Sequence, residues 1–474
     1  MSSTVITAAS SEPLTAEDLT AFFRRAERPD PATHKVGTEQ EKFGVAITPG
    51  GVEPVDFRRH ITPVLEAFVA EYGWRPASDR GVNGEIIALE RDGASITLEP
   101  GGQFELSGAP LPHIHATCAE FTTHYRELHA VSQRLGLAWL ATGFHPFATR
   151  EDVRWVPKGR YAKMREYLPT RGSRGLDMML RTCTVQANFD YASERQAGER
   201  LRMAMGISGL TTAIFANSPY REGVDSGFSS LRSDNWTDVD NARCGLLPFV
   251  FDGEFAYERY VEWALTVPMF FVRRGDRYVP VHLPFAEYMK TGFVDEGGTL
   301  HRATKGDWEM HLSTLFPEIR LKPYIEVRGS DSVGSRFVCA LPALWKGVLY
   351  DEEAGRAAWD LVRDLDFAGR QALWAECREQ GMRSPRVLQL SRELLAIGRK
   401  GLERQDVRDS KGRTEARFLD AIEEVVGSGR SPADLVREAL GAAPGRDTAA
   451  RRAFVRQFHF AGVGLEEDLA DPDA

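Results

Sequence analysis

The chain has 474 residues, of which 42% are apolar and 27% are charged, and its formal net charge is −9. This composition is ordinary for a folded globular protein, and it argues against extensive disorder. No run of lysine and arginine is longer than two residues, so the charge pattern gives no indication of a nucleic-acid partner.

The first residues and the cysteines predict where the protein works. Residues 1–14 have neither the basic nor the apolar region of a secretory signal, and they lack the arginine of an organelle transit peptide. No apolar run approaches the length of about eighteen residues that spans a membrane, so we expect no membrane partner. The five cysteines are scattered and form no CxxC pair, which fits a reducing compartment. We therefore predict a cytoplasmic protein.

The chain is predicted to begin with a flexible tail over residues 1–14. Thr15 and Asp18 have the spacing of a capping box, which predicts a helix over about residues 15–27. Apolar residues recur at helical spacing over about residues 61–72, which predicts a second helix.

The pattern becomes purely helical past about residue 352. Ser431 followed by proline marks the start of a last predicted helix. The other helical segments, rich in Ala, Leu, Glu and Arg, are 353–380, 386–404 and 413–426. We predict an α+β fold in which residues 15–350 form the catalytic body, 351–463 a helical layer of the same domain, and 464–474 an acidic tail.

Two predicted strand regions in the first quarter of the body carry pairs of glutamates. Glu39 and Glu41 lie two apart before an apolar strand, so they share one face. The segments 94–99 and 103–106 flank a Pro-Gly-Gly turn, which predicts a hairpin that brings Glu99 near Glu105.

Two later strands alternate apolar and polar residues. In the segment 183–190, Gln186 and Asn188 share the polar face. In the segment 324–329, Glu326 and Arg328 share a face opposite Ile325 and Val327.

Glutamate is depleted in strands, so its repetition requires an explanation. One explanation is an antiparallel sheet with a solvated face, on which glutamate is ordinary. The other is a cluster of carboxylates that holds Mg²⁺ against nucleotide phosphates, because Mg²⁺ prefers hard oxygen ligands. The pattern alone leaves both explanations open.

Three arginines have a similar ambiguity. Arg232 lies in a polar segment where it could clamp a carboxylate in a bidentate manner, or form an ion pair at the surface. Arg160 and Arg165 lie in a basic helix start, which is either solvated or in contact with a phosphate or carboxylate. The chain has no GxxxxGK[ST] motif and no GxGxxG after a strand, so an ATP site would be built from carboxylates and a sheet.

Eight segments in collinear order resemble the glutamate–cysteine ligases of the plant and proteobacterial type. They are GTEQEKFG (37–44), SITLEPGGQFELSGAPL (95–111), PKGRY (157–161), LDMMLRTCTVQANFDY (176–191), FANSP (215–219), LRSDNWTD (231–238), LLPFVFD (246–252) and YIEVRGSD (324–331). The resemblance covers about residues 35–440 and implies a glutamine-synthetase-like carboxylate–amine ligase fold. In that fold a curved antiparallel sheet forms a funnel, with helices outside it.

The resemblance also implies a reaction. ATP would phosphorylate the side-chain carboxylate of L-glutamate, and the amino group of L-cysteine would attack the acyl phosphate. The product would be γ-glutamylcysteine, the first intermediate of glutathione biosynthesis. A related ligase that uses another amine acceptor is the main alternative, and a guanidino kinase or a binding protein without activity are two others.

The family motifs imply a role for each candidate residue. Arg328 would stabilise charge on the transferring phosphoryl group, and Arg232 would bind the α-carboxylate of glutamate. Gln186, Asn188, Arg160 and Arg165 would contact substrate or nucleotide. The implied Mg²⁺ ligands are Glu39, Glu41, Glu99, Glu105 and Glu326.

Plant members of the family have cysteines at the positions of Cys118 and Cys339, where they can form a redox-responsive disulfide. The resemblance therefore implies the same pairing here as a hypothesis. The second regulatory pair of the plant enzymes is missing, because residues 281–298 contain no cysteine. We expect a monomer or a homodimer.

Overall fold

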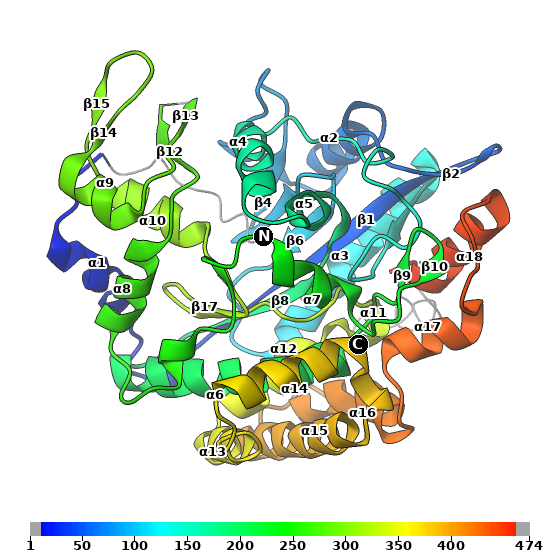
Figure 1. The fold of residues 1–474 in the computed structure, drawn as a ribbon. Helices are drawn as coiled ribbons and strands as arrows, with labels where there is room; N and C mark the ends of the chain where they lie inside the picture. Colours follow the sequence, from blue (N-terminus) through cyan, green and yellow to red (C-terminus); the bar gives the residue numbers. More distant parts are fainter. Residues whose placement is uncertain (1–10, 276, 461–474) are drawn as a thin grey trace.

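The computed structural model describes residues 11–275 and 277–460. At its centre lies a ten-stranded sheet in the order β17-β18-β8-β1-β6-β5-β4-β3, with β2 and β7 also paired to β1 (Figure 1). The strands of this sheet are β1 (Val36–Thr48), β2 (Gly51–Pro54), β3 (Arg75–Pro76), β4 (Ala88–Arg91), β5 (Ala94–Leu98), β6 (Phe104–Ser107), β7 (Leu137–Leu140), β8 (Val185–Phe189), β17 (Ile319–Leu321) and β18 (Ile325–Val327). Every pairing within it is antiparallel.

Strand β1 organises the sheet because it changes partners along its length. Its first half pairs with β8 over residues 36–40 and with β6 over residues 39–42. Its second half pairs with β7 and β2. The strand thus joins two parts of one antiparallel sheet, and the predicted carboxylates Glu39 and Glu41 lie in its first half.

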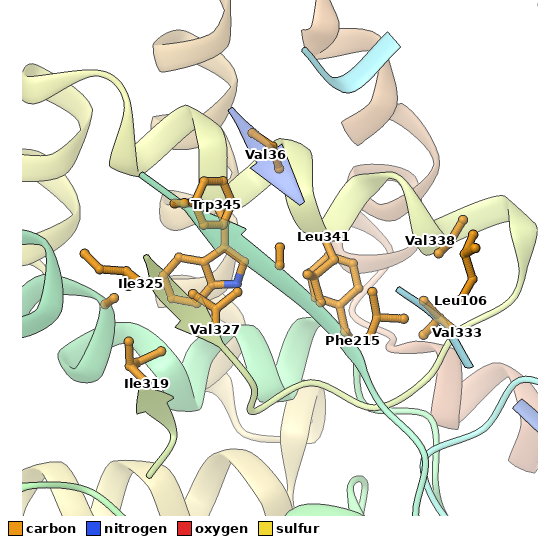
Figure 2. Packing of buried hydrophobic residues seen from close by; sticks show 14 of the residues in the cluster. Val36, Leu106, Phe215, Ile319, Ile325, Val327, Val333, Val338, Leu341 and Trp345 are labelled. Atoms are coloured by element: carbon orange, nitrogen blue, oxygen red, sulfur yellow. The ribbon is translucent and has the colours of Figure 1, made fainter. Parts of the chain in front are cut away.

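Helices pack against the outside of the sheet, which confirms the predicted α+β fold. The longer ones are α2 (Thr62–Glu71), α3 (Ile114–Leu135), α6 (Glu194–Ile214), α12 (Ala340–Leu349), α14 (Phe367–Glu379) and α15 (Pro385–Gln405). Figure 1 shows α6, α12, α14 and α15 together below the sheet. In Figure 2, Trp345 and Leu341 of α12 lie among apolar side chains that include Val36, Ile325 and Val327, all at most 2% exposed. Burial of this apolar surface is the main stabilising contribution.

Some of the remaining elements lie together, and the others are distributed along the chain. One group lies on the left of Figure 1 and consists of α1 (Ala16–Arg24), α8 (Tyr257–Thr266), β12 (Phe271–Arg274), β13 (Arg277–Pro280), α9 (Phe285–Thr291), β14 (Phe293–Val294), β15 (Leu300–His301) and α10 (Lys305–Ser313). The other elements are α4 (Gly159–Tyr167), α5 (Gly175–Arg181), β9 (Tyr220–Arg221), β10 (Val224–Asp225), α7 (Leu231–Asn235), β11 (Cys244–Gly245), β16 (Phe316–Pro317), α11 (Ser335–Val338), α13 (Glu352–Asp360), α16 (Asp420–Gly427), α17 (Pro432–Leu440) and α18 (Thr448–Phe458). Within residues 11–275 and 277–460, no helix is both long enough and apolar enough to span a membrane.

The predicted helix starts agree with the structure. Thr15 and Asp18 form the capping box at the start of α1. Ser431 and Asp434 form another capping box, at the start of α17. The predicted second helix is α2, and a π-helical turn over Phe57–Ile61 precedes it.

Two of the C-terminal helix predictions are wrong in their bounds, and a third is wrong in its place along the chain. The segment 353–380 is two helices, because Asp366 caps the start of α14 by accepting a hydrogen bond from the backbone N–H of Gly369 at 2.7 Å. The segment 413–426 begins as a 3₁₀ helix before α16. The helix after Ser431 is not the last one, because α18 follows it.

The predicted N-terminal tail lies partly and the predicted acidic tail, 464–474, wholly outside the described residues, since 1–10 and 461–474 are not described. Within residues 11–14, the N–H of Leu14 donates to the carbonyl of Ala303 at 3.1 Å. The carbonyl of Glu12 accepts from the N–H of Lys305 at 3.0 Å. The division into body, helical layer and tails stays a prediction.

A buried ion pair joins the helical layer to the body. Lys346 of α12 donates to Glu415, and both side chains are at most 4% exposed. The other carboxylate oxygen of Glu415 accepts from the N–H of Ile114 at the start of α3, at 2.6 Å. One carboxylate therefore holds together three segments that are far apart in the sequence.

We expect Glu415→Gln to lower the free energy of unfolding by about 3–5 kcal/mol, because it leaves the buried charge of Lys346 without its partner. The measurement is a denaturant titration of the purified chain. The matched control is Glu424→Gln, which breaks the exposed pair with Arg336 and should cost less than about 1 kcal/mol. Equal losses of unfolding free energy in the two variants would contradict a stabilising role of the buried pair.

Candidate active site

The register of the sheet places the five predicted glutamates on one face. Glu41 of β1 lies directly opposite Glu105 of β6, and Glu39 lies opposite Gln186 of β8. Glu326 of β18 lies opposite Asn188. Directly opposite residues of antiparallel strands share a face, and so do residues two apart on one strand.

Glu99 completes the set, just beyond the end of β5. Its N–H donates to the carbonyl of Gln103 at 3.0 Å, so the pairing of the hairpin continues to this position. Thr97, two residues earlier, lies opposite Glu105. The predicted hairpin is therefore confirmed, and it brings Glu99 onto the same face as Glu105.

These carboxylates are not on a solvated surface. The exposed fractions are 4% for Glu39, 3% for Glu41, 2% for Glu99, and 0% for both Glu105 and Glu326. The explanation of a solvated sheet face is therefore excluded for all five. Charged groups are buried at a cost of several kcal/mol each unless other groups compensate for them.

Burial and neighbouring like charges raise the pKa of three members of the set. Burial raises the pKa of Glu39, and the charge of Glu326 raises it further. Burial also raises the pKa of Glu99, with a contribution from the charge of Glu41. The pKa of Glu105 is raised well above its usual value by burial and then by Glu39, Glu99 and Glu41. Neighbouring like charges disfavour the ionised form, so this face favours the entry of a cation.

Glu326 is in a different situation, because three cations surround it. Burial acts to raise its pKa, but Arg320, Lys322 and Arg328 together hold it well below the usual value. Arg320 donates to both carboxylate oxygens, at 2.7 and 2.9 Å, and Nη1 of Arg328 donates at 2.7 Å. Nζ of Lys322 lies 3.6 Å from Oε1.

The donor set fits Mg²⁺ in its chemistry, because carboxylate oxygens are the ligands that this ion prefers. Oε2 of Glu39 and Oδ1 of Asn188 are buried without a hydrogen-bond partner among the described residues, and such oxygens could receive a cation. In the side-chain positions of the described residues, no three Asp, Glu, His or Cys side chains are placed around one metal position. Binding would therefore require rotation of the glutamate side chains on a face that already presents them.

Arg328 and Arg232 lie at the same face, each 4% exposed. Nη1 of Arg328 also donates to Oε1 of Gln186 at 2.7 Å, which links β18 to β8. Nη2 of Arg232 donates to the backbone carbonyl of Arg328 at 3.0 Å. Burial lowers the pKa of Arg232, while the charges of Asp331, Glu41 and Glu318 act against that shift. The explanation of Arg232 as a surface ion pair is therefore wrong.

The two arginines of the basic helix start, Arg160 and Arg165, differ in burial. Arg160 of α4 is 7% exposed, and the charge of Glu99 acts on its guanidinium. Arg165 lies on the exposed side of α4, with its guanidinium 4.7 Å from the ring centroid of Trp155. The structure thus brings Arg160 close to the glutamates and leaves Arg165 at the surface.

A cleft of about 760 Å³ opens beside the charged face. Glu39 and Asn188 line it together with Gly37 and Tyr324. Its other lining residues include four that are basic, namely Arg28, Lys35, Arg75 and Arg91. The lining also includes the acidic Glu90, Asp92 and Asp190, so its charge is mixed, and the basic side chains are the candidate contacts for an anion.

Sequence reasoning missed three residues of this site. Arg320 and Lys322 alternate with Ile319 and Leu321 on the strand that pairs with β18, so strand periodicity was a signal that could have identified them. Asp331 follows the end of β18 and gave no such signal, because its hydrogen-bond partners are more than a hundred residues away in the sequence.

The structure joins Cys118 of α3 and Cys339, at the start of α12, in a disulfide. The bond links segments 221 residues apart. Cys183, Cys244 and Cys377 are free and buried. Whether the disulfide responds to redox conditions stays a proposal.

We expect mass mapping to find Cys118 and Cys339 protected when the oxidised, unfolded chain is alkylated without reductant. The three free cysteines serve as the internal control, because they should be fully alkylated in the same sample. After reduction all five should react. Full alkylation of Cys118 and Cys339 before reduction would contradict the pairing.

Comparison with known proteins gives the same family for nearly the whole chain. The model of glutamate–cysteine ligase family 2 matches residues 35–456. A chloroplastic glutamate–cysteine ligase B from Oryza sativa subsp. japonica is 42% identical over 89% of this chain and 83% of its own length. A chloroplastic glutamate–cysteine ligase from Arabidopsis thaliana is 41% identical over 90% of this chain and 80% of its own.

A solved structure supports the fold. The glutamate–cysteine ligase from Francisella tularensis in complex with AMP superposes with a TM-score of 0.51 and 14% identity, and the match covers 94% of this chain and 93% of that one. At this identity the likeness concerns the fold alone. It agrees with the predicted carboxylate–amine ligase architecture.

The predicted location is contradicted by these relatives. The plant ligases are named as chloroplastic, which contradicts the prediction of a cytoplasmic protein. The prediction rested on cysteine usage and on the composition of the first residues. Sparse, scattered cysteines are compatible with more than one aqueous compartment, so they could not decide between them.

Proposed function

The chain belongs to the glutamate–cysteine ligase family, and from this premise we propose that it joins the γ-carboxylate of L-glutamate to the amino group of L-cysteine at the expense of ATP. The product is γ-glutamylcysteine, which serves glutathione biosynthesis. The observation that carries this proposal is the gathering of five buried glutamates and Arg328 on one sheet face, with Arg232 of α7 hydrogen-bonded to the carbonyl of Arg328.

The glutamates suit this chemistry because two anions, ATP and glutamate, must approach each other. Mg²⁺, when bound, would neutralise the phosphates at the transferring group. The residues that would hold it are Glu39, Glu41, Glu99, Glu105 and Glu326. Because Glu326 already contacts Arg320 and Arg328, its participation would require exchange of at least one of these contacts.

The cleft beside Glu39 and Asn188 is our proposed nucleotide site. Tyr324 offers an aromatic surface for a base, and the basic residues of the lining offer positive charge for phosphates. Asn188 donates from Nδ2 to Oε1 of Glu39 at 2.9 Å, so it holds that carboxylate between the cleft and the charged face.

Arg232 and Arg328 have separate proposed roles. A γ-carboxylate oxygen of glutamate attacks the γ-phosphorus as the bond to ADP breaks, and Arg328, fixed by Gln186 and Glu326, stabilises the charge on the transferring group. Arg232 binds the α-carboxylate and fixes the substrate in place. The amine then attacks the acyl carbon, loses a proton, and phosphate leaves.

The test is ADP release by the purified chain with Mg–ATP and L-glutamate, with and without L-cysteine. We expect strong release only when both amino acids are present, and the mass of γ-glutamylcysteine in the product. Release with a different amine instead would retain the ligase chemistry and contradict cysteine as acceptor. No release with any pair of substrates would contradict the function.

We expect Glu99→Gln and Glu326→Gln each to lower turnover by about 10²–10³-fold, because each removes one charge of the proposed metal set. Steady-state rates and circular dichroism measure turnover and folding. The matched control is Glu53→Gln on β2, where the side chain is 49% exposed, and it should leave turnover unchanged. Normal turnover in a folded variant would remove that glutamate from the set.

A further inference from the structure

Asp331 is a fully buried carboxylate that the proposed mechanism does not use. It lies just beyond β18 and accepts three hydrogen bonds. Oδ2 accepts from the backbone N–H of Asn217 at 2.7 Å and from Oγ of Ser218 at 2.6 Å. Oδ1 accepts from Oγ of Ser230 at 2.7 Å. One carboxylate therefore ties together two separate segments, 217–218 and 230.

The two serine hydroxyls connect Asp331 to α7 through further hydrogen bonds. A hydroxyl has one hydrogen to donate, so a serine that donates to Asp331 presents its lone pairs to other donors. Oγ of Ser218 accepts from the N–H of Arg232 at 3.2 Å. Oγ of Ser230 accepts from the N–H of Ser233 at 3.1 Å and caps the helix. Asp331 thus sets the direction of both hydroxyls.

Helix α7 depends on these contacts because it spans only residues 231–235. So short a helix does not form on its own in water, and its geometry comes from the groups that hold it. Arg232 is its second residue, and the guanidinium reaches the carbonyl of Arg328 at 3.0 Å. The position of Arg232 relative to Arg328 is therefore set partly through Asp331.

The surroundings of Asp331 leave little freedom. A Cβ atom added at Gly143 would lie 2.2 Å from Cγ of Asp331, so a side chain there would displace the carboxylate. The N–H of Gly143 donates to the carbonyl of Asn217, at 3.2 Å. The backbone at Gly143 thus approaches Asp331 closely.

We propose that Asp331 is a positioning residue for substrate recognition, which acts through Ser218 and Ser230 to hold Arg232 where it binds the α-carboxylate of an amino acid. The inference rests on the proposed function of Arg232. It adds that the affinity for the amino-acid substrate depends on a carboxylate that never touches it.

The sign of the effect distinguishes positioning from simple electrostatics. Burial lowers the pKa of Arg232, and the charge of the Asp331 carboxylate opposes that shift. If charge alone mattered, removal of Asp331 would strengthen the binding of an anionic substrate. If Asp331 positions Arg232, its removal weakens that binding.

The experiment is steady-state kinetics of the full chain with Asp331→Asn. An amide keeps one acceptor oxygen and places its NH₂ group either against the Ser230 hydroxyl or against the Asn217 N–H and the Ser218 hydroxyl, so one or two of the three hydrogen bonds are lost. We expect KM for glutamate to rise about tenfold or more, as loss of a hydrogen bond to a charged group implies. KM for ATP should stay within about twofold of wild type.

The matched control is Asp307→Asn, a buried aspartate of α10 that accepts from Arg274 at 2.7 and 2.8 Å. It should lower Tm and leave both KM values unchanged. Ser218→Ala provides a second, milder variant, because it removes only the hydroxyl between Asp331 and the N–H of Arg232. It should raise KM for glutamate in the same direction.

Three results would overturn the inference. The first is an unchanged or lowered KM for glutamate in Asp331→Asn. The second is an equal rise in the KM values for glutamate and ATP in that variant. If Asp331→Asn does not fold, the third is an unchanged KM for glutamate in Ser218→Ala. Absence of glutamate-dependent ADP release by the wild type would instead contradict the proposed function.

Discussion

The structure depends on one electrostatic constraint, which is that several glutamates are held close together on a buried sheet face. Like charges in a poorly solvated place repel one another, and burial adds its own cost. The pairing of β1 with β6 and β8 nevertheless fixes Glu41 opposite Glu105 and Glu39 opposite Gln186. A fold that served stability alone would not place these residues together, and we propose a cationic ligand as the reason for the arrangement.

The buried glutamates differ in their electrostatic surroundings, and this difference distinguishes two regions of the site. Glu326 is paired with arginines, whereas burial and neighbouring charges raise the pKa of Glu105. The region around Glu326 is an ion-pair network, whereas the region around Glu105 is one in which a cation would be favourable. Arg328 lies at the boundary between the two, because it contacts Glu326 and Gln186 at once. Transfer of a phosphoryl group needs such a boundary, where a metal-bound anion meets a fixed positive charge.

Much of this face could be predicted from the sequence, because strand periodicity is a local signal. Alternation placed Glu326 with Arg328, and the turn after Glu99 predicted the hairpin. Burial could not be predicted in this way, since the pattern of a solvated face and that of a buried charged face are the same. The position of Asp331 depends on contacts with distant segments, which no periodicity encodes. The break between α13 and α14 likewise depends on one capping aspartate within a continuous helical pattern.

The most direct test of the central claim is a crystal structure with Mn²⁺ and a non-hydrolysable ATP analogue, measured at a wavelength where manganese scatters anomalously. The account predicts anomalous peaks at coordination distance, about 2.0–2.3 Å, from carboxylates of the set Glu39, Glu41, Glu99, Glu105 and Glu326, with the analogue in the cleft beside Asn188. A bound nucleotide whose metal ions contact none of these five carboxylates would contradict it.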